Sequence, residues 1–250
     1  MLIKKLTALL FLCWLLQACV TVDEGRSKGE KASAVNVELG IGYMQQNNLE
    51  LANEKLLKAL RQDPNSVRAN YIYAILQDRL LQKETAERYY RIAIDLDSNN
   101  SEANNNYGAF LCRNGRELES VEYFLQAVDN PLYKTPEFAY TNAAICLLKI
   151  DRPVEAKEYL SKALAAKGDF AAALLPMGEL LFNEGDHANA RRIFTRLHQV
   201  SQPTAKGLWL HIRNEIELGG AGSNRVERLG EQLQQNFADS EEFREWQKIR

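Results

Sequence analysis

The pattern of small and large apolar residues along this chain repeats. Small residues recur at intervals of 34, 34, 36 and 34, at Gly40, Ala74, Gly108, Ala144 and Gly178. A second small residue follows each after twelve positions, at Ala52, Ala86, Ser120, Ala156 and Ala190. Four positions after the second small residue stands a large apolar residue, at Leu56, Tyr90, Phe124, Leu160 and Phe194. Three positions after that stands a fourth column, at Ala59, Ala93, Ala127, Ala163 and Leu197. A period of this length predicts a pair of antiparallel helices in every unit.

These four columns match the tetratricopeptide pattern, which predicts an all-α superhelix. The small residue on the first helix should meet the small residue on the second, where the two backbones come closest. The intervals place the units at about residues 33–66, 67–100, 101–134, 137–170 and 171–204. The fourth interval is two residues longer, and "NPLYKTP" at 130–136 is the expected insertion. Residues 205–250 are interpreted as a degenerate sixth unit with a C-terminal capping helix.

The start of the chain has the layout of an export signal. Lys4 and Lys5 precede an apolar run from Leu6 to Leu16, which is shorter than the roughly 18 residues of a membrane-spanning helix. Leu16 to Cys19 resembles the lipobox of bacterial lipoproteins. This resemblance implies that residues 1–18 are a cleaved signal peptide and that Cys19 carries covalent lipid. Residues 19–32 are polar and predict a lipidated, flexible tether.

The residue following Cys19 bears on which membrane the protein would reach. It is Val20, where bacterial sorting signals place an aspartate to retain a lipoprotein in the inner membrane. By that resemblance the protein is expected on the periplasmic face of the outer membrane, held by lipid.

Composition and motifs argue against nucleic-acid binding and against catalysis. With 31 Lys and Arg against 33 Asp and Glu, the chain has no basic excess for a phosphate backbone. Neither an HExxH motif, a phosphate-binding glycine loop nor a nucleophile elbow is present. His187 and His198 would stand about 16 Å apart on one helix, too far to share a metal ion. We therefore expect no enzyme, no metal, no cofactor and no small-molecule substrate.

Two cysteines of the repeat region are candidates for a disulfide bond. Cys112 and Cys146 both fall on first helices of adjacent units, which pack side by side in such arrays. An exported protein meets an oxidising compartment, so a disulfide between them would join the third and fourth units. The alternative is a pair of buried thiols that act as small core residues.

The first helices also carry a candidate partner-binding groove. Positions one and three residues from the packing column should face the concave surface and would be polar by default. The candidate groove positions, most of them apolar, are Val37, Ile41, Tyr71, Ile75, Asn105, Ala109, Phe138 and Ile145. An apolar stripe outside the stacking face indicates a groove for a partner's helix or strand. The alternative, that some of these residues extend the core and that the Asn105 amide bridges helices, stays open.

The segment "SEANNNYGAFLCRNGRELESVEYFLQAV" (101–128), together with the lipobox and the repeats, resembles the PilF/PilW family of type IV pilus biogenesis lipoproteins. Members of this family act as pilotins. The resemblance implies that the protein binds secretin subunits and promotes their localisation and multimerisation in the outer membrane. It also implies that the early units hold the client. Alternative functions are an adaptor for cell-wall hydrolases or a part in outer-membrane protein assembly.

Overall fold

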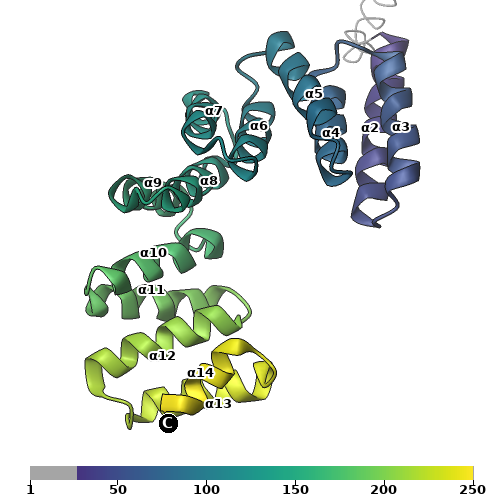
Figure 1. Cartoon of the computed structure of the whole chain (residues 1–250). Coiled ribbons are helices and arrows are strands. Elements are labelled where there is room, and N and C mark those ends of the chain that lie inside the picture. The colour runs from purple at the N-terminus through teal and green to yellow at the C-terminus, as the bar shows by residue number, and fades with distance from the viewer. Residues whose placement is uncertain (1–26, 250) are drawn as a thin grey trace, which may run out of the picture. The chain divides into compact units, whose positions relative to one another are not determined.

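The structure, a computed structural model, describes residues 27–249, and within this range the regular elements are all α-helices (Figure 1). The chain divides into two compact units at the Leu96–Asp97 junction. The first unit contains α2 (Lys28–Gln45), α3 (Leu49–Gln62), α4 (Val67–Arg79) and α5 (Lys83–Leu96). The second contains α6 (Ser101–Arg113), α7 (Glu117–Asp129), α8 (Pro136–Lys149), α9 (Pro153–Ala166), α10 (Ala171–Asn183), α11 (His187–Val200), α12 (Ala205–Gly219), α13 (Asn224–Phe237) and α14 (Glu241–Ile249). The predicted all-α fold of helix pairs is confirmed.

The first helix starts earlier than the sequence pattern suggested. The tether was expected to run through residue 32, but α2 already begins at Lys28. Ser27 and Glu30 form a capping box: the Ser27 N–H donates to Glu30 Oε2 at 2.8 Å, and the Glu30 N–H donates to Ser27 Oγ at 3.2 Å. These two bonds satisfy backbone donors that a helix end otherwise leaves unpaired, and so they fix the start. The predicted signal peptide and Cys19 lie outside the described residues.

The packing between the two helices of a pair differs from the expectation for its glycine. The glycine was expected to meet the small residue twelve positions later. Instead it lies against the large residue sixteen positions later: a Cβ on Gly178 would come within 2.6 Å of Phe194 Cε1. At Gly108, a Cβ would come within 2.9 Å of Phe124 Cε1 and also within 3.0 Å of the backbone oxygen of Ser120, so here the expected close approach to the small residue is present beside the ring. Glycine is therefore required because the buried phenyl ring fills the space of a side chain.

The turns inside the pairs form a fifth repeating column. In the first five pairs, the second residue after the first helix adopts a left-handed backbone, with positive φ at Asn47, Leu81, Gly115, Asp151 and Gly185. This conformation suits glycine and is strained for leucine. Leu81, with φ of 60°, is therefore the least favourable residue in this column. The six-residue connection from Asn130 to Thr135 lies within the predicted insertion.

The last pair, α12 and α13, carries α14 as a cap. Val226, Gly230 and Leu233 keep the four-then-three spacing of the second-helix columns and are all buried, so Gly230 takes the place of the large residue. A Cβ on Gly230 would lie 2.6 Å from Cε2 of Trp246 in α14. The indole of the capping helix thus supplies the bulk that the second helix lacks.

Candidate partner-binding surface

In the first unit, the candidate groove positions fall into two classes on α2 and α4. Val37 and Tyr71, three residues before the packing column, are only 1% and 8% exposed. Val37 packs in the core cluster with Leu56 and Ala59. Residues three apart lie on the same face of a helix, so this column is directed inward with Gly40. Val37 is therefore a core residue, and its assignment to an open groove is wrong.

The other column of the first unit lies at the edge of the core. Ile41 and Ile75, one residue after the packing column, are partly buried and rest against the same cluster. One helical step rotates a side chain by about 100°, which brings this column out of the interface. Beside it, the Arg68 guanidinium of α4 donates to the Glu38 carboxylate of α2. The result is an apolar strip with one ion pair along its side.

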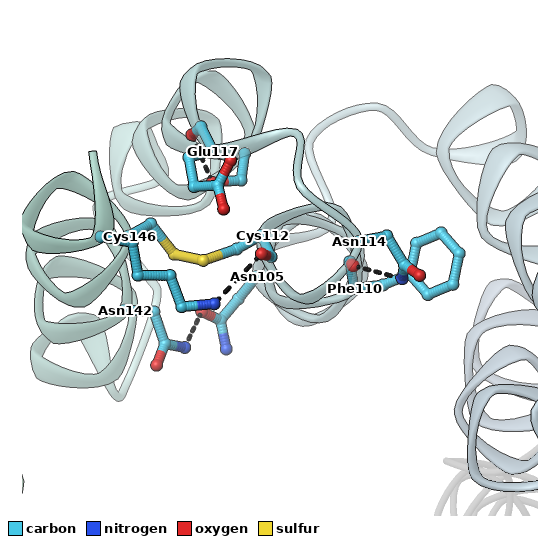
Figure 2. The surroundings of a disulfide bond; sticks show 9 residues. Asn105, Phe110, Cys112, Asn114, Glu117, Asn142 and Cys146 are labelled. Carbon is cyan, nitrogen blue, oxygen red and sulfur yellow. Dashed lines mark hydrogen bonds between the residues drawn. A yellow bond between two sulfur atoms is a disulfide. The ribbon is translucent and has the colours of Figure 1, made fainter.

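In the second unit, a disulfide joins α6 to α8 (Figure 2). Cys112 and Cys146 are bonded, with Cα atoms 5.9 Å apart, as the sequence predicted. The Lys149 ammonium donates to the Cys112 carbonyl at 3.2 Å. The Asn142 amide of α8 donates to Asn105 Oδ1 at 3.0 Å, so this candidate groove residue bridges two helices of the array.

The remaining candidate positions in the second unit differ in how far their side chains are exposed. Ala109 is partly buried against the cluster around the disulfide. Phe138 is 45% exposed, and its ring meets Phe170 edge-on, with the two centroids 4.7 Å apart. Phe170, just before α10, was not singled out from the sequence; its signal is an aromatic residue that lies 32 positions after another. Together Phe138 and Phe170 present aromatic surface at the start of α8 and α10.

Ile145 lies in an open hollow of about 400 Å³ between first helices of the second unit. Its side chain is 41% exposed. Leu148, Pro176 and Leu180 provide the other apolar lining. Pro176 stands inside α10 and has no N–H, so it gives the carbonyl of Ala172 no helical hydrogen bond. The hollow thus offers apolar contact to a partner segment.

The sequence reasoning missed Pro176, although a proline within a predicted helix is a visible signal. Among the described residues, no helix combines the length and the hydropathy that crossing a bilayer requires.

Comparison with known proteins identifies the repeat and the relatives. The tetratricopeptide repeat family model matches residues 37–80 and 74–132. The type IV pilus assembly protein PilF of Pseudomonas aeruginosa is 32% identical over 240 residues, which cover 93% of each chain. An uncharacterized protein of Haemophilus influenzae is also 32% identical, over 57% of this chain and 79% of that protein.

Solved structures agree with the sequence relatives. A structure of Pseudomonas aeruginosa PilF has a TM-score of 0.82 and 29% identity, covering 90% of this chain and all of that one. A crystal structure of PilW, a type IV pilus biogenesis factor, has a TM-score of 0.76 and 31% identity, covering 85% and 97%. On this similarity over nearly the whole length, the chain belongs to the PilF family of tetratricopeptide-repeat proteins of type IV pilus assembly.

Proposed function

We propose that this protein is an outer-membrane lipoprotein that acts as a pilotin: it binds secretin subunits and promotes their localisation and multimerisation for type IV pilus biogenesis. The relationship to PilF over 93% of both chains carries the proposal. The structure adds partly exposed apolar side chains on first helices, at Ile41 and Ile75 in one unit and at Phe138 and Ile145 in the other.

The proposed mechanism uses binding alone. Ile145 and the apolar lining of its hollow would bury the apolar residues of a client segment, as a peptide groove does. Burial of apolar area gives about 25 cal/mol per Å² before the costs of association are counted. This contact needs neither a nucleophile nor a cofactor, so we propose a non-enzymatic adaptor.

The second part of the mechanism is the anchor. Covalent lipid on Cys19 would hold the protein on the periplasmic face of the outer membrane, since two or more acyl chains bind a bilayer stably. A client held by an anchored adaptor has a raised local concentration at that membrane. Membrane insertion and ring assembly of secretin subunits are favoured without any chemical step.

The test compares heat-resistant secretin multimers on denaturing gels of outer-membrane fractions. Cells that lack the gene should lose multimers while secretin monomer persists, and the wild-type gene should restore them. A Cys19→Ser gene should restore folded protein but few outer-membrane multimers, because the anchor is missing. Unchanged multimers in the deletion strain would refute the pilotin function, and full restoration by Cys19→Ser would refute the role of the anchor.

A further inference from the structure

An open hollow of about 320 Å³ lies among α11, α12 and α13 in the second unit. Arg225, Arg228 and Gln232 line it from α13, where spacings of three and four residues place them on one face. Thr195 and Gln199 line it from α11, one turn apart. All five side chains can donate hydrogen bonds. The hollow is thus rich in donors on two opposing helices.

The charge of this hollow is positive. None of its lining residues is acidic, and two are arginines. The nearby carboxylate of Glu215 is buried and accepts two hydrogen bonds from Arg191, at 2.6 and 2.7 Å. Arg225 Nη1 lies at a longer 3.6 Å from Glu215 Oε1, and Arg228 has no ion pair within the described part of the chain. Since Arg191 already neutralises Glu215, the charges of Arg225 and Arg228 are left without full compensation.

A histidine pair also lines the hollow. The rings of His198 and His211 stack with centroids 5.2 Å apart and planes 17° from parallel. His211 is only 4% exposed. Among the described residues, the four ring nitrogens have no hydrogen-bond partner; Nε2 of His211 lies 3.4 Å from Glu215 Oε1 but is not aligned with it. Unpartnered buried polar atoms are rare in native proteins, and a bound ion or water is one arrangement that satisfies them.

The histidines are held neutral by their surroundings. Burial lowers the pKa of the His198 imidazole. Burial, with the charges of His198 and Arg225, lowers the pKa of His211 to about 4 against the opposing effect of Glu215. The charged and titratable groups around the pair are Arg191 and His198 on α11, His211 and Glu215 on α12, and Arg225 and Arg228 on α13. A negative charge added here would favour the protonated imidazoles.

We propose that this hollow binds an oxyanion, a phosphate or carboxylate group, through Arg225 and Arg228 beside the stacked His198–His211 pair. Guanidinium groups match the oxygens of both anions with paired N–H donors. The volume is at the lower end of ligand pockets, roughly 300–1,000 Å³, so it suits one small group. Because anion and proton stabilise each other, binding is tighter at lower pH.

The first experiment uses the three histidines as reporters. Imidazole NMR signals of the full chain after residue 18, carrying Cys19→Ser, are followed during titration with inorganic phosphate at constant ionic strength. His198 and His211 signals should shift saturably, whereas His187, which contacts Asn214, should not. Arg228→Gln should weaken binding about tenfold or more. Arg244→Gln, on α14 outside the lining, should leave it unchanged.

Three results would overturn the proposal: no saturable shift, an equal shift of His187, or equal weakening by Arg228→Gln and Arg244→Gln. Sulfate, whose charge is constant between about pH 5 and 7, isolates the proton linkage. It should bind more tightly at pH 5, closer to the lowered pKa of His211, and equal affinity at both pH values would refute the role of the histidines.

Free phosphate and a lipid headgroup present the same chemistry, so a second arm separates these sources. The same protein is sedimented with vesicles of phosphatidylglycerol or of phosphatidylcholine. Binding to the anionic vesicles that Arg228→Gln weakens and free phosphate competes would support a headgroup as the ligand. Phosphate binding in solution without vesicle binding would support a small free anion. Binding in neither arm overturns the proposal.

Discussion

The fifth helix pair and the terminal pair fill the space beside a glycine with side chains from different helices. In α10 and α11, Gly178 stands on the first helix and the buried Phe194 on the second. In α12 and α13, the corresponding positions are Ile212 and Gly230. A third helix then contributes Trp246, which covers Gly230.

The comparison shows how an array ends. An internal second helix such as α11 carries its own large residue, the buried Phe194, at this position. The terminal second helix carries glycine there and receives an indole from α14. Phe243 and Trp246 of α14 are buried, whereas most of its other residues are exposed and polar. A terminal unit needs such a polar outer face to remain soluble, and the glycine–tryptophan contact fixes the cap in place.

The largest expected effect comes from removing the indole. Trp246→Ala should lower the free energy of unfolding of the second unit by about 3–5 kcal/mol, because a large buried side chain is lost over Gly230. Denaturant unfolding measures the loss, and amide hydrogen exchange should locate it in α12 to α14. An effect spread equally over α6 to α9 would show that α14 does not act as a local cap.

Acid should destabilise the terminal pair through His211 on α12. Its folded pKa of about 4 lies below the ordinary value near 6.5, so the unfolded chain binds the proton more readily. The contribution of this pKa difference to the free energy of unfolding is therefore fully present above about pH 6.5. It is lost as the pH falls toward 4, by up to roughly 3 kcal/mol. His211→Gln should flatten this part of the pH profile in denaturant unfolding. An unchanged profile would show that His211 titrates normally in the folded protein.

Adding one methyl group tests whether both glycines are required for space. Gly178→Ala and Gly230→Ala should each lower the free energy of unfolding by about 1–3 kcal/mol through clash with Phe194 and Trp246. Gly42→Ala is the matched control, because a Cβ there meets nothing within 4 Å. That change should stabilise α2 by about 0.5–1 kcal/mol.

A double-mutant cycle tests the contact between Gly230 and Trp246 directly. In the Trp246→Ala background, the cost of Gly230→Ala should largely disappear, since the clashing ring is gone. A cost that persists unchanged would show that Gly230 is needed for some reason other than the indole.

The smallest effect is expected in the turns. Leu81 has a positive φ and is largely exposed, whereas Gly115 occupies the equivalent turn of the next pair. Leu81→Gly should raise the free energy of unfolding by about 0.5–1 kcal/mol, as the left-handed conformation no longer strains a side chain. Thermal unfolding of the two proteins gives the comparison, and a lower midpoint for the variant would contradict it.

The period of 34 sufficed to predict the helix pairs, because every unit repeats the same interface. It failed in the terminal unit. The two-residue shift before Val226 hid the terminal columns, and the contact between Gly230 and Trp246 depends on a helix outside the repeat. No periodic pattern contains such a contact.

The candidate groove shows a second limit of the sequence. Val37 and Tyr71, three residues before the packing column, lie on the buried face, whereas Ile41 and Ile75, one residue after it, are partly exposed. The oxyanion hollow was missed because its arginines and histidines come from three helices with no shared motif.

The most direct test of the account is a calorimetric titration of the purified chain with purified secretin domains. We predict saturable binding that Ile75→Glu or Ile145→Glu weakens about tenfold or more, since a charge replaces apolar contact. Val154→Glu, at an 80% exposed apolar site on α9, should bind as the wild type does. No binding by the folded wild-type protein, or equal weakening by all three variants, would contradict the assignment of these first-helix surfaces to a secretin client.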